Sequence, residues 1–181
     1  MMVGNSGKDN KAAKKMLYIS IAGVLPVIII LCIYVNNQNS HLLHFMSVIS
    51  SDVPALLSTK SPLLSSAMSF YVKTSPLYGV IFFVLSYKDL RLGKSLPVEK
   101  LIITLLLFSF LYFFIIFFLL FNHVDITNAG RLLQFLSRND YLLTIFFVSV
   151  FYVCYIFTCY YFSFVYAIYV IFKEKHKIND I

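Results

Sequence analysis

Few residues of this sequence combine the types and the spacing that metal binding or catalysis requires. His41 and His44 are three positions apart in HLLHFMSVI, which would place two imidazoles on one face of a helix. Two ligands alone make a poor metal site, so we interpret both histidines as solvated. His123 and Asp125 follow a long apolar run and could form an acid–base couple, but we predict a local ion pair. These pairs therefore predict no catalytic or metal site.

The cysteines and the known catalytic motifs give no further signal. Cys32, Cys154 and Cys159 all lie inside apolar runs, their number is odd, and the sequence has no CxxC pair. The sequence also lacks H-E-x-x-H, G-x-S-x-G and paired aspartates within an apolar run. We therefore expect no enzyme activity, no cofactor, no metal and no small-molecule substrate.

The composition is that of a protein whose solvent is lipid. Hydrophobic residues make up 60% of the chain and charged residues 13%, against about 45–50% and about 25% in soluble domains. A core of the chain's own size cannot bury such an excess. The net charge of +7 does not indicate nucleic-acid binding, because the basic residues flank apolar runs and form no separate domain.

Four apolar runs are long enough for membrane-spanning helices, which need roughly 20 residues each. We place them at about 16–35, 68–87, 101–121 and 141–172, within a single membrane domain over 1–181. The predicted fold class is an all-α integral membrane protein with four transmembrane helices in a small bundle. The first run is too long for a cleaved signal, so we expect it to remain as an anchor.

The basic residues are distributed unevenly about these spans. Most flank the two termini and the loop between the second and third spans, and such an excess is typical of cytoplasmic segments. We therefore predict that both termini are cytoplasmic. The residues on the predicted inner side are Lys8, Lys11, Lys14, Lys15, Lys88, Arg91, Lys94, Lys100, Lys173, Lys175 and Lys177.

The second span is unusual because FYVKTSPLYGVIFF, residues 70–83, contains a lysine and a proline. Lys73 would lie roughly 7–8 Å below the outer surface, and its stem can lift the ammonium to the headgroups. Pro76 falls near the start of the helix, where a lost backbone hydrogen bond costs little. Thr74 and Ser75 could bond the freed carbonyls. These residues fit a structural role, and a functional one stays open.

Two segments on the predicted outer side carry further patterns. Residues 41–49 have helical apolar spacing with Ser40 as a candidate N-cap, and they fit either a short interfacial helix or a collapsed loop. In DITNAGRLLQFLSRND, 125–140, the Asn-Ala-Gly sequence predicts a tight turn in which glycine supplies an unusual backbone angle. A short interfacial helix would follow. The segment is either an ordinary anchored loop or an external recognition patch.

Short motifs in these segments resemble a known family. They are Y-x-K-T-x-P at Tyr71–Pro76, T-x-A-G-R at Thr127–Arg131, and N-D at Asn139 and Asp140. Together with four spans and basic inner loops, they are similar to the immunity proteins against pore-forming colicins of the colicin A and B type. The resemblance covers about Lys11 to Lys173. Asn128 departs from it, because family members carry a threonine there.

The resemblance implies a partner and a place in the cell. The protein would sit in the lipid bilayer of the bacterial inner membrane, bind the hydrophobic hairpin of a pore-forming colicin's channel domain, and prevent channel opening without catalysis. Partner recognition would fall on the motif residues and the nearby basic rim. These are Lys73, Thr74, Pro76, Thr127, Gly130, Arg131, Arg138 and Asp140.

Other interpretations of the sequence stay open. Four spans also fit a small transporter or channel subunit, although the lack of intramembrane acidic residues and histidines counts against it. An accessory subunit of a larger membrane complex is a third reading. The aromatic run 145–164 either packs internally and faces lipid or offers a surface to a partner helix. Its phenols are Tyr152, Tyr155, Tyr160 and Tyr161.

Overall fold

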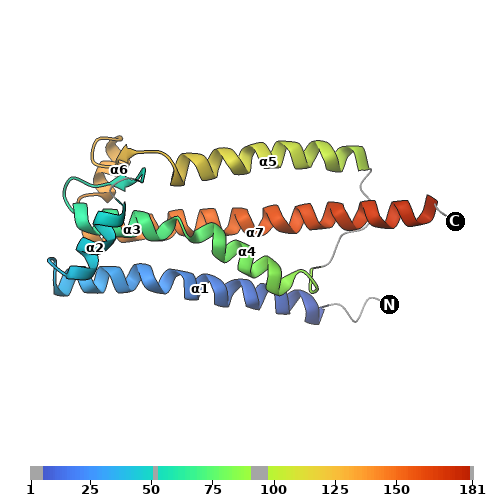
Figure 1. Ribbon diagram of the computed structural model, residues 1–181, viewed down its shortest axis with the longest axis horizontal. Helices are drawn as coiled ribbons and strands as arrows, with labels where there is room; N and C mark the ends of the chain where they lie inside the picture. The colour runs from blue at the N-terminus through green and yellow to red at the C-terminus, as the bar shows by residue number, and fades with distance from the viewer. Residues whose placement is uncertain (1–5, 51–52, 91–97, 180–181) are drawn as a thin grey trace.

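The computed structural model describes residues 6–50, 53–90 and 98–179, with side chains over 11–50, 53–90 and 100–173. Four helical segments in this part of the chain are long and apolar enough to cross a membrane, which confirms the all-α membrane fold class. Figure 1 shows them running lengthwise, with both termini at one end. Arg91 and Lys94 of the predicted inner loop, and the side chains of Lys8, Lys175 and Lys177, lie outside the described residues.

The central helix of the bundle is α7 (Asp140–Asn179). Half of the residues in its most apolar stretch are buried, because α1 (Ser6–Asn36) and the second span both pack against it. Phe147, Phe151 and Tyr155 of α7 are fully buried in the core. The third span, α5 (Val98–Leu120), packs chiefly on α7, and only 11% of the residues in its most apolar stretch are buried.

The second span consists of two helices, α3 (Pro62–Val72) and α4 (Ser75–Ser86), which meet at Lys73 and Thr74. The helical run therefore begins at Pro62, whereas the sequence analysis placed the start of this span at about residue 68. The difference has a physical cause. The first turns of α3 are rich in serine, which lowers their hydropathy, yet Ser65, Ser66 and Ser69 are buried there.

The end of the bundle opposite the termini is closed by a group of short elements that we call the cap. They are α2 (His41–Ser50), β1 (Leu56–Leu57), β2 (Val124–Asp125) and α6 (Arg131–Leu136), with their connecting loops. The two short strands pair in parallel, with Leu56 opposite Val124 and Leu57 opposite Asp125. The structure thus selects the helical reading of 41–49 and confirms a short helix after the turn at 128–130.

Candidate functional site

Three of the eight predicted recognition residues contact one stretch of chain, residues 54–61, which we call the cap segment. Lys73 donates a hydrogen bond from its ammonium to the Pro54 carbonyl. The Thr127 hydroxyl accepts one from Thr59, and the Asp140 carboxylate accepts one from Ser61. Residues from the second span, the loop after the third span and the start of the fourth span therefore converge on this segment, which the sequence analysis did not single out.

The Thr127 contact is part of a hydrogen-bonded turn. Thr127 Oγ1 accepts hydrogen bonds from both the backbone N–H and the hydroxyl of Thr59, each at 3.0 Å. On its other side, Asp125 Oδ1 accepts the Thr127 N–H at 2.9 Å, and Asp125 Oδ2 accepts Asn128 Nδ2 at 2.7 Å. An aspartate that bonds the backbone two residues on is a standard turn device. The turn is therefore fixed to β2 on one side and to the cap segment on the other.

Gly130 ends this turn in a backbone conformation that favours glycine. Its φ is +117°, as the turn pattern predicts, and a β-carbon built there would meet nothing within 4 Å. The cost of a side chain at this position is therefore backbone strain and not a clash. The Gly130 carbonyl then accepts the Gln134 N–H at 2.9 Å, which starts α6 and sets the position of Arg131.

Asp140 joins the second and fourth spans. It is the first residue of α7, and its Oδ1 accepts the Ser61 hydroxyl at 2.5 Å, immediately before α3 begins at Pro62. A negative charge in the first turn of a helix is also favourable for the helix dipole. Asp140 therefore holds the starts of α3 and α7 together.

The break between α3 and α4 is held by local bonds. Thr74 Oγ1 donates to the Tyr71 carbonyl at 2.7 Å, and Pro76 lies in the first turn of α4, where its missing N–H is harmless. The expectation for Ser75 is wrong, because its buried hydroxyl bonds to no carbonyl of the described residues. For Lys73, the structure supplies a protein oxygen, that of Pro54, where the sequence analysis expected headgroups.

Serines of α3 form a ladder that the sequence analysis missed. Ser65 Oγ accepts the Ser58 N–H at 2.9 Å, and Ser69 Oγ accepts the Leu56 N–H at 3.0 Å. With Ser61, these serines are spaced by four positions, so they share one face of the helix. That spacing was a usable signal. The ladder holds β1 and the cap segment against the second span.

Comparison with known proteins identifies the family. The family model described as "Colicin immunity protein" matches residues 39–176, a range that contains the whole cap and most of the bundle. The chain belongs to the colicin immunity protein family. It is 27% identical over 142 residues to the Colicin-A immunity protein of Citrobacter freundii, covering 78% of this chain and 80% of that protein. It is 28% identical over 150 residues to the Colicin-B immunity protein of Escherichia coli, covering 82% and 85%. No solved structure matches the chain.

Membership of this family gives the chain a role in colicin immunity, and its four apolar helices fit a multi-pass membrane protein. The exposed charged groups of the cap are then of interest as candidate contacts for a partner. Arg131 and Arg138 are exposed and form no ion pair with any described residue. The only ion pair among the described residues is at the opposite end, between Lys15 and Asp89 at 2.7 Å. Of the eight predicted residues, these two arginines are therefore the charged groups left available to a partner.

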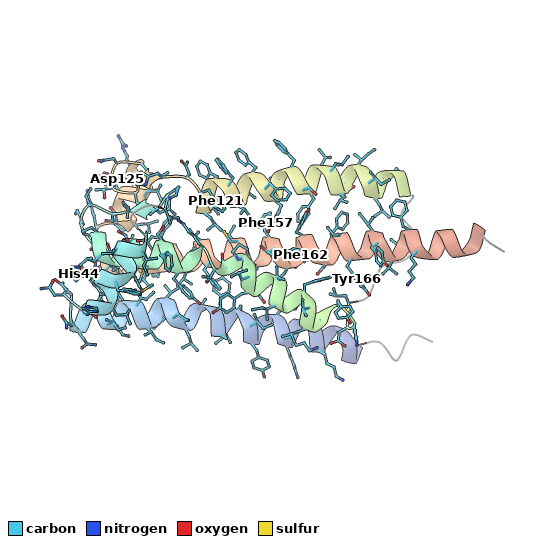
Figure 2. All side chains as sticks on the ribbon, viewed as in Figure 1. His44, Phe121, Asp125, Phe157, Phe162 and Tyr166 are labelled. Atoms are coloured by element: carbon cyan, nitrogen blue, oxygen red, sulfur yellow. The ribbon has the colours of Figure 1, made fainter. Side chains whose placement is uncertain are left out.

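One other prediction about the polar residues has a clear outcome. The His123–Asp125 ion pair is wrong, because His123 Nδ1 faces the Ala55 N–H at 3.4 Å while Asp125 is occupied by its own turn. Asp125 lies at the cap end of the molecule (Figure 2). The described residues contain no cluster of three metal-ligating side chains, and the three cysteines are free.

The phenols of the aromatic run divide between internal and exposed positions. Tyr155 is fully buried and donates to the Met16 carbonyl of α1 at 2.9 Å. Tyr161 stacks on Tyr112 of α5, with ring centroids 4.4 Å apart. Tyr160 is 61% exposed and lines an apolar groove of about 420 Å³ between α5 and α7. Internal packing therefore uses part of this run and leaves part of it at the surface.

Proposed function

We propose that this chain protects the producing cell by binding the pore-forming domain of a cognate colicin within the inner membrane, and that it does so without turnover. Both termini would be cytoplasmic, and the cap would face the periplasm, from which the toxin arrives. The match of the family model to residues 39–176 carries this proposal. The two relatives support the pore-forming class, because they are immunity proteins for colicin A and colicin B.

The charge distribution supports this orientation. Both termini lie at the end of the bundle opposite the cap (Figure 1), so Lys11, Lys14, Lys15 and Lys173 belong to that end. Cytoplasmic ends of membrane proteins carry the excess of Lys and Arg. The cap has few basic residues by comparison, among them the exposed Arg131 and Arg138.

The predicted recognition residues would act in three ways. Arg131 and Arg138 would contact or steer the toxin, since they are exposed and not paired with acidic residues of the described chain. Three residues, Lys73, Thr127 and Asp140, would hold the cap segment in place through their bonds to it. The remaining three, Thr74, Pro76 and Gly130, would set the backbone path.

The exposed side of α5 offers a surface for the toxin's hydrophobic hairpin. Phe110, Phe114 and Phe117 are 75%, 59% and 65% exposed, and the rings of Phe110 and Phe114 stack with centroids 6.5 Å apart. Association of helices in lipid depends on such packing, because lipid tails are as apolar as the side chains. Binding would favour the closed state of the channel, and a differential affinity of a few kcal/mol shifts that equilibrium strongly.

A protection assay tests the proposal. Sensitive cells expressing the chain are challenged with a panel of pore-forming colicins of the A and B type, and with a nuclease colicin as the control toxin. We expect survival against at least one pore-forming colicin and none against the nuclease. Killing by every pore-forming colicin of the panel, with the chain present in the membrane, would overturn the proposal.

The same assay tests the role of the arginines. The double variant Arg131→Ala, Arg138→Ala should insert into the membrane normally. It should protect cells against the colicin only when it is expressed above the level that suffices for the wild type. Lys100→Ala, which removes an exposed basic residue at the opposite end, is the matched control and should protect as the wild type does. Equal protection by both variants would remove the arginines from recognition.

A further inference from the structure

The exposed surface of α2 has three apolar side chains along one edge and a histidine at the other edge. At about 100° per residue, Leu42, Phe45 and Ile49 lie within about 60° of one another, and the centre of that sector lies about 130° from His44. These three residues are 49%, 59% and 45% exposed, and we call them the apolar flank. His44 is exposed at the other edge, which we call the histidine flank, and the exposed His41 and Val48 lie between the two edges, about 70° and 90° from the centre of the apolar flank. The buried residues, Leu43 and Ser50, lie on the remaining side of the helix and face the bundle.

The depth of α2 is fixed at both of its ends. Only residues 37–40 separate its first residue from the last residue of the spanning helix α1, so it starts close to the membrane surface. At its other end, Ser50 Oγ and Ser66 Oγ are 2.6 Å apart, and Ser66 is part of the second span. Ser66 lies about 6 Å along α3 from Pro62 at a rise of about 1.5 Å per residue. The end of α2 is therefore level with the first turns of a spanning helix.

The direction of the two flanks agrees with this depth. Figure 2 shows His44 on α2 at the cap end of the molecule. With His44 on the outer side of α2, the apolar flank, whose centre is about 130° around the helix, would be directed back toward the membrane. Its three side chains would be costly to expose to water, whereas hydrocarbon at that level would cover them.

We propose that α2 is an interfacial anchor whose apolar flank is inserted into the hydrocarbon edge of the adjacent lipid leaflet, with His41 and His44 among the headgroups. Interfacial helices of this kind bury an apolar face about 5–10 Å into the boundary between headgroups and acyl chains. The anchor would fix the cap, through the Ser50–Ser66 contact, at a constant height above the bilayer. The proposal needs membrane insertion only, and holds whether or not the chain binds a colicin.

Fluorescence in liposomes tests it directly, because the chain has no tryptophan. Phe45→Trp reports on the apolar flank and His44→Trp on the histidine flank, in vesicles whose lipids are brominated either near the headgroup or near the chain end. We expect Phe45→Trp to be quenched several-fold more by lipid brominated near the headgroup than His44→Trp, and to emit at shorter wavelength. His44→Trp should be quenched more by aqueous acrylamide. Ile49→Trp, on the same flank, should repeat the Phe45→Trp result.

A fourth variant provides the control for insertion. Phe110→Trp, on the exposed side of α5, should be quenched most by lipid brominated near the chain end, which confirms that the protein is inserted. With that control satisfied, strong acrylamide quenching of Phe45→Trp would show a flank in water and would overturn the proposal. Protection of Phe45→Trp from both acrylamide and brominated lipid would show that protein, such as a second copy of the chain, covers the flank, and would overturn it equally.

Discussion

Two helices, α4 and α5, both pack aromatic rings on α7, for example Phe83 of α4 on Phe162, but their other contacts with α7 differ. α4 also approaches α7 closely at a glycine, since a β-carbon built on Gly79 would lie 2.6 Å from Thr158 Cβ and 3.2 Å from the Tyr155 carbonyl. α5 contacts α7 through rings, with Phe108 facing Phe157 and Tyr112 stacked on Tyr161. In Figure 1, α5 lies along one side of α7 and α4 lies between α7 and α1.

The difference extends beyond the contacts with α7. The span that contains α4 is tied to the cap by directional hydrogen bonds that serines of α3 accept, while α5 shows one side-chain hydrogen bond to α7 among the described residues, between Tyr112 and Thr158. Directional bonds specify one arrangement, whereas apolar packing in lipid is less selective. We infer that the α3–α4 span is the rigid part of the fold and that α5 is the helix whose surface can adapt to another helix.

The largest effect is expected at Gly79. Gly79→Val should separate α4 from α7 and lower the free energy of unfolding by about 1–3 kcal/mol or more, because the site is already filled by Thr158. The midpoint of thermal unfolding in detergent measures it. Phe110→Val, at a 75% exposed position on α5, is the control and should change the midpoint little. Equal changes at both sites would remove the distinction between the two helices.

A second large effect is expected at Gly130, in the cap. Gly130→Val places a β-branched residue at φ +117°, at a cost of about 1–3 kcal/mol that remains local to the turn. Colicin protection should therefore fall more for Gly130→Val than for Leu133→Ala, which removes part of a half-buried side chain of α6. Equal loss of protection from both variants would show that the turn has no special role.

The sequence was sufficient for the parts of the fold that depend on hydropathy. α5 is uniformly apolar, and its predicted bounds of 101–121 lie within one residue of the candidate span at Lys100–Leu120. The start of the second span was not predictable in this way. A serine reads as polar whether it faces water or bonds a buried backbone N–H, and Ser65 and Ser69 do the latter.

The candidate site was predictable only where a local pattern carried it. The backbone angle of Gly130 follows from the turn sequence, and the structure confirms it. The convergence of Lys73, Thr127 and Asp140 on residues 54–61 depends on contacts between positions far apart in the chain. Hydropathy and motif spacing contain no information about such contacts.

A moderate effect is expected from the serine ladder. Ser69→Ala leaves the buried Leu56 N–H without its acceptor, which should cost about 1–3 kcal/mol and loosen β1. Ser149→Ala is the control, because that exposed hydroxyl bonds only the Ile145 carbonyl of its own helix. Hydrogen exchange of the cap amides measures the difference. If Ser69→Ala exchanges no faster than Ser149→Ala in the cap, the ladder does not hold the cap segment.

The smallest effect is expected from the polar contact of α5. Tyr112→Phe removes the hydroxyl that lies 3.2 Å from Thr158 Oγ1 but keeps the ring stacked on Tyr161, and Thr158 still donates to the Cys154 carbonyl. Side-chain hydrogen bonds between membrane helices average about 0.6 kcal/mol, so the unfolding midpoint should change little. Tyr112→Leu also removes the stacking and should cost about 0.5–1.5 kcal/mol more. A large loss for Tyr112→Phe alone would mean that a directional bond positions α5 as well, and the contrast with α4 would then be one of degree.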